Sequence, residues 1–256
     1  MFAEGELVSL KSDLPPEALA VVRELAGRER RANGPMMRAI NGFGGQVEGW
    51  ATRLPAPARR MIDEGAERLL MNLYEGAAGV QKRLPAGGRN AHKIAAALSG
   101  AAGGAAGIAS AVVELPATVM VMFGAMQKVA AENGFDPASQ EVRLTCIDIF
   151  GSGGAGTGDD GVNSSFLASR LGLNGATIKA LIARVAPAFS VMLGKTLAAK
   201  AVPLIGAAAG AGINYAFTDY YQEIARVRFG LQRLVVEHDE ASVVAAYRAE
   251  SLTRQG

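Results

Sequence analysis

The stretch "CIDIFGSGGAGTGDDG", residues 146–161, carries the spacing G-x-G-x-x-G at Gly151, Gly153 and Gly156. In a dinucleotide site such glycines let the backbone approach a pyrophosphate closely. That site needs a strand before the glycines and an acidic residue about 20 residues further on. Here the preceding residues are expected to end a helix, and positions 171–180 hold no acidic residue. We therefore interpret the glycines as part of a flexible loop between helices, with no bound nucleotide.

Residues that commonly bind metals or act as nucleophiles are few and far apart. The two histidines, His92 and His238, show no spacing that is typical of a metal site. The single cysteine, Cys146, is expected in the core, and one cysteine excludes an internal disulfide. We expect no metal ion, no cofactor and no catalytic constellation.

Two polar residues stand out in apolar surroundings and are the candidate ligand-binding residues. Glu114 is the single charged residue between Ile94 and Gln127. It is either a buried acid with a raised pKa at a lipid- or ligand-facing site, or an acid favoured by a helix N-terminus, and we favour the second. Asn214 is either a ligand contact or a buried hydrogen bond between helices, and again we favour the second.

Prolines and glycines divide the first 57 residues of the chain. We expect a polar N-terminal segment, residues 1–57, with short helices at 16–31 and 47–54. The Arg28–Arg31 cluster is interpreted as a solvated helix face. Residues 58–256 are expected to form the helical domain.

Within that domain, apolar spacing predicts an amphipathic helix over 58–75. Two apolar helices are expected next, at about 92–112 and 116–131. The break between them is placed at Glu114-Leu115-Pro116, because proline disfavours helix at the residue before it.

Residues 134–150 are expected to hold a helix end and a new helix. Gly134 is suited to cap the helix before it. Asp136 followed by Pro137 favours a new helix that runs to about Phe150. Further helices are expected at about 164–171, 175–186, 187–201, 203–236 and 239–252.

Small residues four apart suggest close helix packing. They occur as Gly100-xxx-Gly104, as Gly103-xxx-Gly107 and as Gly206-xxx-Gly210. We predict that Gly103, Gly104 and Gly107 lie against another helix, and we favour the helix at 203–218 as that partner. The fold class is therefore all-α, a multi-helix bundle with two Gly/Ala-rich apolar central helices or hairpins.

Three stretches, "GIASAVVELPATV", "ENGFDPASQEVR" and "KAVPLIGAAAGAGINYAFT", together resemble the EcsC protein family over about residues 60–236. The matching positions are Glu114, Leu115, Pro116, Gly134, Asp136, Glu141, Arg143, Pro203, Gly206, Ala207, Gly210, Ala211 and Asn214. Glu114 stands where aspartate is common, and Phe135 stands where tyrosine is expected. The resemblance implies a bacterial, hydrophobic, all-helical protein of unestablished biochemical activity, and it supplies no catalytic residues.

The net charge and the first residues of the chain indicate which partners and which cellular compartment to expect. The net charge of +2, from 26 basic and 24 acidic residues, argues against a nucleic-acid binder. The first residues include Glu4 and Glu6, and they lack the pattern of a secretory signal. We expect a cytoplasmic protein, peripheral on the inner face of the cytoplasmic membrane.

Two functions remain open at this point. The first is a non-enzymatic protein that associates reversibly with a membrane surface or a lipid-like ligand. Residues 94–113 just reach the ~20 residues of a membrane span, but alanine and glycine are weakly lipophilic, so peripheral association is favoured. The alternative is a soluble bundle that binds an apolar ligand or acts as an enzyme through Glu114. The Gly/Ala-rich helices also offer a surface for forming homo-oligomers.

Overall fold

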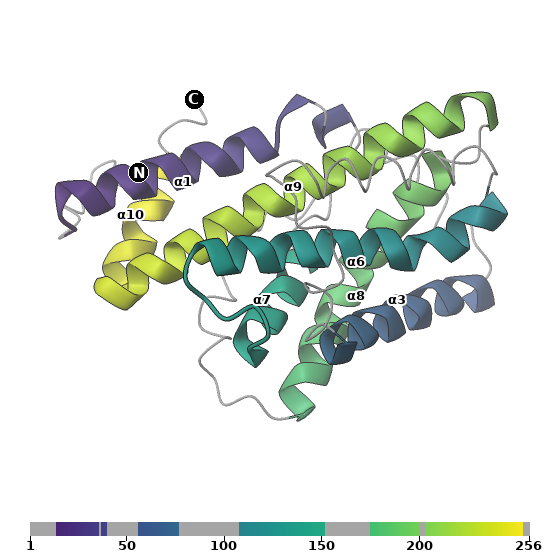
Figure 1. Ribbon diagram of the computed structural model, residues 1–256, viewed down its shortest axis with the longest axis horizontal. Coiled ribbons are helices and arrows are strands. Elements are labelled where there is room, and N and C mark those ends of the chain that lie inside the picture. The colour runs from purple at the N-terminus through teal and green to yellow at the C-terminus, as the bar shows by residue number, and fades with distance from the viewer. Residues whose placement is uncertain are drawn as a thin grey trace, which may run out of the picture.

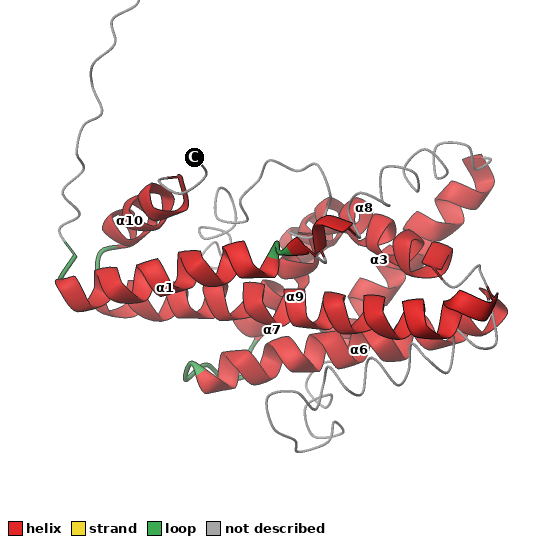
Figure 2. Cartoon of the chain, turned by 90° about the horizontal axis from the view of Figure 1, so that it is seen from above, coloured by secondary structure: helices red, strands yellow, loops and turns green. Residues whose placement is uncertain are grey.

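The computed structural model describes residues 14–35, 37–39, 56–76, 108–151, 175–199 and 203–252. This part of the chain is almost entirely helical and contains no strand (Figure 2), which confirms the all-α prediction. The helices are α1 (Pro16–Ala32), α3 (Ala56–Gly76), α6 (Ile108–Glu132), α7 (Gln140–Gly151), α8 (Gly175–Ala199), α9 (Pro203–Glu237) and α10 (Glu240–Leu252).

Helix α9 organises the bundle. It has 35 residues and is therefore about 50 Å long. Helix α6 packs along α9 and begins at the same end of the molecule, while α1 packs on α9 in the opposite direction (Figure 1). Helices α3 and α7 pack against α8, and α10 turns back to lie beside α1 (Figure 2).

Two groups of buried side chains hold the helices together. The larger group joins α3, α6, α7, α8 and α9 and includes Ala32 at the end of α1 and Met37. At its centre the ring of Phe150 lies 6.3 Å from Phe123, 5.1 Å from Phe189 and 4.9 Å from Tyr221, measured between ring centroids. The smaller group joins Leu14 and α1 to the second half of α9 and to α10. Its members are Leu14, Ala18, Val22, Leu25, Ala26, Val227, Leu231, Leu234, Val243, Ala246 and Tyr247.

Four of the expected helix ranges are confirmed. Helices α1, α3, α9 and α10 begin and end within two residues of the expected bounds. The expected helices at 47–54 and 164–171 lie outside the described residues, as do residues 92–107 with their glycine pairs. The boundary at residue 57 stays a prediction; α1, which precedes it, packs on α9 and α10.

The expected helix breaks at Pro116 and Pro187 are wrong. Helices α6 and α8 each continue through their proline. An interior proline costs about 3 kcal/mol because it removes one backbone hydrogen bond and crowds the preceding turn. Both prolines lie on exposed positions, and buried residues follow within three positions, Val119 in α6 and Phe189 in α8. Burial of these helices in the core offsets the local cost.

The expected cap at Gly134 is confirmed. Its φ of +87° is a left-handed conformation that glycine adopts without strain. The Gly134 N–H donates to the Ala131 carbonyl, and the Phe135 N–H donates to the Ala130 carbonyl, each at 3.0 Å. These two bonds satisfy the last carbonyls of α6 in the Schellman arrangement.

The expected start of the next helix at Asp136 and Pro137 is wrong by three residues. Helix α7 begins at Gln140, and its cap is Ser139, whose Oγ accepts from the Val142 N–H at 3.2 Å. Asp136 caps a turn before the helix instead, because its Oδ1 accepts from the Ala138 N–H at 2.9 Å. A serine three residues before a free N–H competes well for the capping role.

One glycine brings two helices into close contact. Gly230 of α9 faces Leu25 of α1, and a Cβ at Gly230 would lie 2.8 Å from the Leu25 Cδ2. Such a distance is shorter than carbon–carbon contact, so the helices approach this closely because residue 230 has no side chain.

Candidate functional site

A pocket of about 390 Å³ lies between α1, the end of α6 and the second half of α9. We call it the charged pocket. Its lining is a mixture of acidic, basic and apolar side chains from three helices. The lining residues are Val21, Glu24, Leu25, Arg28, Glu132, Asn133, Arg226, Gly230, Arg233, Leu234 and Glu237.

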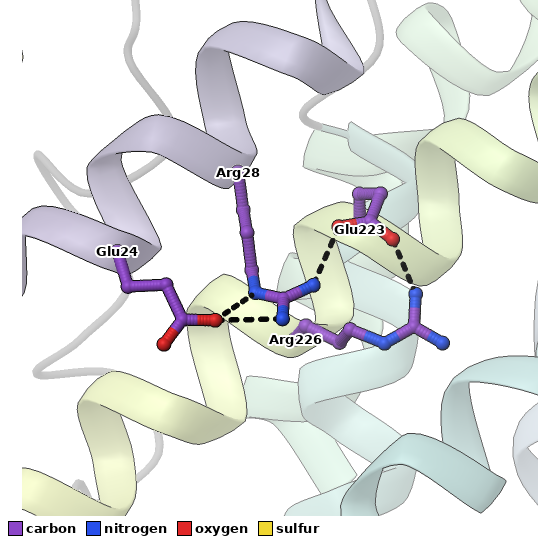
Figure 3. A network of polar contacts seen from close by, with 4 residues as sticks. All are labelled: Glu24, Arg28, Glu223 and Arg226. Carbon is purple, nitrogen blue, oxygen red and sulfur yellow. Dashed lines mark hydrogen bonds and ion pairs between the residues drawn. The ribbon is translucent and has the colours of Figure 1, made fainter. Parts of the chain in front are cut away.

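A chain of ion pairs fixes two arginines of the charged pocket (Figure 3). Arg28 of α1 donates through Nε and Nη2 to the Glu24 Oε1, at 3.1 and 2.7 Å. Its Nη1 donates to the Glu223 Oε2 at 3.2 Å. The second Glu223 oxygen, Oε1, accepts from Arg226 Nη1 at 2.5 Å. Glu223 therefore holds one arginine from each of α1 and α9.

Burial and hydrogen bonding act in opposite directions on Arg28. Partial burial lowers its pKa, but the hydrogen bonds to Glu24 and Glu223 outweigh burial, so the pKa of Arg28 is raised. Arg28 stays charged throughout the physiological range. The Glu24 side chain is 59% exposed, so its ion pair with Arg28 contributes little stability. The Glu223 side chain is only 16% exposed, so Glu223 is the partner that holds Arg28 in place.

The interpretation of Arg28–Arg31 as a solvated face is wrong for its first three residues. Arg28 pairs with Glu223 of α9, the Glu29 carboxylate accepts from the Tyr247 hydroxyl at 2.6 Å, and Arg30 donates to the Glu250 carbonyl at 3.4 Å. Their partners on α9 and α10 lie about 200 positions away in the chain, so the neighbouring residues contain no signal for these contacts.

Three charged residues of the pocket lack an ion-pair partner within the described ranges. Glu132 ends α6, Glu237 ends α9, and Arg233 lies one turn before Glu237; all three are exposed. An arginine placed before a glutamate at i,i+4 is the less favourable order for a helical ion pair. The pocket thus presents both signs of unneutralised charge.

A second ionic cluster ties the bundle together on another side. Asp148 of α7 accepts from Arg184 of α8 at 2.6 Å and from Arg228 of α9 at 2.5 Å. Arg228 is 5% exposed and Arg184 is 47% exposed. Because each partner comes from a different helix, the cluster fixes their relative positions.

The residues of the Glu114 motif lie in one continuous helix. The backbone of Glu114, Leu115 and Pro116 belongs to α6, and Pro116 is exposed. The side chains of Glu114 and Leu115 lie outside the described part of the structure. Either role for Glu114, as helix-terminal acid or as ligand or catalytic residue, stays a prediction.

Glu141 and Arg143 point in different directions, as expected from their spacing. Glu141 is exposed. Arg143 Nη1 donates to the Tyr74 carbonyl at 2.9 Å, and its guanidinium lies 4.8 Å from the centre of the Tyr74 ring. Arg143 thereby fixes the end of α3 on α7, which is a structural role.

The third motif lies in the first half of α9. Pro203, Gly206 and Gly210 belong to the helix, and Asn214 is fully buried. The Thr218 hydroxyl donates to the Asn214 backbone carbonyl at 2.7 Å. Burial of Asn214 agrees with an internal position, and its role in ligand binding stays a prediction.

The remaining candidates behave as core or lie outside the described residues. Cys146 is fully buried as expected, and burial raises the pKa of its thiol, which keeps it protonated. Residues 140–151 form a helix, so the strand required before a dinucleotide loop is replaced by α7. Gly151 is the last residue of that helix, whereas Gly153 and Gly156 lie outside the described residues, as does His92.

Together these observations define an all-helical bundle with an apolar core and a charged pocket at one end of its central helix. The chain belongs to the EcsC protein family, whose family model matches residues 80–234. This match covers α6, α7 and α8 and nearly all of α9, while α1, α3 and α10 lie outside it. No curated protein and no solved structure matches the chain.

Proposed function

We propose that the protein acts by binding rather than by catalysis, and that it associates reversibly with a membrane surface through one end of the bundle. We call this region the apolar end; it comprises residues 108–127 of α6 and 203–218 of α9. Glu114 is the single charged residue in these two segments. The two helices pack together and begin at the same end of the molecule (Figure 1), so the segments share one region of the bundle.

The observation that carries the proposal is the exposure of large apolar side chains at the apolar end. Met120 of α6 is 37% exposed and Tyr215 of α9 is 40% exposed. Methionine adapts to irregular apolar surroundings, and tyrosine is favoured where hydrocarbon meets water. Within the described residues, no helix is both long and apolar enough to cross a bilayer. Contact with the interface is the mode of association that these residues support.

Vesicle flotation tests the proposal with the full chain. Vesicles of phosphatidylcholine and phosphatidylglycerol are mixed with wild type, with Met120→Glu and with Val236→Glu. Val236 is the matched control because it is 74% exposed but lies at the opposite end of α9. We expect Met120→Glu to weaken binding roughly tenfold, about 1.4 kcal/mol, because a carboxylate must then enter the interface. Val236→Glu should leave binding unchanged.

Two results would contradict the proposal. If the wild-type protein does not float with the vesicles at any lipid concentration, membrane association is refuted. Equal loss of binding in both variants would show that general charge repulsion from the anionic lipid, rather than the apolar end, determines association.

A further inference from the structure

The charged pocket has the properties of a binding site with two poles. Its volume of about 390 Å³ falls within the range of small-ligand sites. It lies along the second half of α9, away from the apolar end, so this inference goes beyond the proposed function. The buried residues Leu25 and Leu234 and the exposed Val21 supply the apolar part of its lining.

Arginines form the first pole. Arg226 and Arg233 are seven residues apart on α9, which places them two turns apart on one face. Gly230 lies between them, and Leu25 of α1 packs onto it, so the two arginines lie on either side of this contact. Glu223 holds Arg226 in position through one guanidinium nitrogen, Nη1, so other donors of Arg226 remain for a ligand. Two planar guanidinium groups suit the several oxygens of a phosphate.

Carboxylates and helix ends form the second pole. Glu132 and Glu237 lie at the C-terminal ends of α6 and α9, and both line the pocket. A helix C-terminus carries partial negative charge, so two helix ends and two carboxylates all favour a cation at this place. Neither carboxylate has an ion-pair partner among the residues that the structure describes.

We propose that the charged pocket binds a phosphate ester that also carries an ammonium group, of the phosphoethanolamine type. The phosphate contacts Arg226 and Arg233, and the ammonium lies between Glu132 and Glu237. This ligand neutralises both poles at once, whereas a simple anion or a simple cation would neutralise one. The same chemistry occurs in a free metabolite and in a lipid headgroup.

Titration of the full chain by calorimetry and by NMR chemical-shift perturbation tests the charge requirement. The probes are phosphoethanolamine and its two halves, inorganic phosphate and ethanolamine. We expect phosphoethanolamine to bind at least about tenfold more tightly than either half, a difference of about 1.4 kcal/mol. Inorganic phosphate that binds equally well would overturn the proposal and leave a simple anion site.

Matched variants locate the site. Arg233→Gln and Glu237→Gln should each weaken phosphoethanolamine binding by about tenfold, since each removes one charged contact. Arg248→Gln on α10 and Glu75→Gln at the end of α3 change residues of the same types that are also exposed but lie outside the pocket, and these variants should bind like wild type. Unchanged binding in both pocket variants, or equal loss in the controls, would refute the assignment.

Vesicles then distinguish the two sources of the ligand. Phosphatidylcholine vesicles with and without phosphatidylethanolamine are added to the protein saturated with phosphoethanolamine. Displacement of the free ligand by phosphatidylethanolamine alone assigns the pocket to a lipid headgroup, and retention assigns it to the free compound. The phosphoethanolamine titrations contain no lipid. A negative result there would refute the ligand proposal and leave the proposed membrane association unaffected.

Discussion

Replacing Gly230 with alanine tests how closely α1 and α9 pack. The new Cβ would lie 2.8 Å from the Leu25 Cδ2, 3.0 Å from its Cδ1 and 3.5 Å from its Cγ. All three carbons belong to the Leu25 side chain, so the new Cβ fits only if this side chain moves. Leu25 is 6% exposed, so its neighbours also limit any movement.

The magnitude follows from two opposing effects. Overpacking a close contact costs about 1–3 kcal/mol. Alanine gains about 1 kcal/mol over glycine in a helix interior. The net change for Gly230→Ala is therefore a destabilisation of up to about 2 kcal/mol. In a Leu25→Ala background the obstruction is absent, and the same substitution should stabilise the protein by about 1 kcal/mol.

Wild type, the two single variants and the double variant are unfolded in urea and followed by circular dichroism. These data show whether the effect of Gly230→Ala on the free energy of unfolding changes sign in the Leu25→Ala background. Leu25→Ala alone should destabilise by about 2–5 kcal/mol because it empties a buried site. The interaction energy between the two positions should reach about 1–3 kcal/mol. If the two effects add to within about 0.5 kcal/mol, the close approach of α1 and α9 at this point is refuted.

Three further predictions concern ionic and capping contacts, each measured by thermal or urea unfolding. Asp148→Ala should destabilise the protein by about 3–5 kcal/mol because it removes the carboxylate that pairs with the buried Arg228. Arg184→Ala should cost less than about 1 kcal/mol because Arg184 is exposed. Equal costs for the two variants would contradict the burial argument. Ser139→Ala should cost about 1 kcal/mol as loss of the α7 cap, and more than Asp136→Ala; the reverse order would restore Asp136 as the cap. Hydrogen bonds from the Ser242 N–H and hydroxyl lower the pKa of Asp239, so its charge stabilises α10 fully above about pH 4 and loses this effect as the pH falls further. Wild type should therefore melt above Asp239→Asn at pH 7, and the difference should shrink as the pH falls below about 4. A difference that does not change with pH would refute the charge effect.

Local patterns predicted the helices well where they depend on neighbouring residues. Apolar spacing placed α3 and α9 within two residues, and Gly134 was identified as a cap because its left-handed conformation is a local requirement. The predicted helix breaks at Pro116 and Pro187 were wrong because the outcome there depends on residues that are distant in the chain. A local cost of one hydrogen bond was outweighed by burial against helices that are distant in the chain.

The charged pocket was not predictable from the sequence. Its residues on α9 follow a helical repeat, Arg226, Gly230, Arg233 and Glu237, which marks one face of a helix. Such a face is usually solvated, and no local signal shows that α1 covers part of it. The contact between Arg28 and Glu223 spans 195 positions. Pairings of this kind are fixed by tertiary packing, which single-sequence patterns do not contain.

The smaller hydrophobic group has a consequence for the order of folding during synthesis. It joins α1, near the start of the chain, to the second half of α9 and to α10, and the Glu29–Tyr247 hydrogen bond spans 218 positions. At about 5–20 residues per second, the ribosome needs roughly 10–40 s to produce the partners of α1. During that interval Val22, Leu25 and the apolar face around them have no native cover. The nascent chain therefore exposes an amphipathic helix that a chaperone or a membrane surface can engage before the bundle closes.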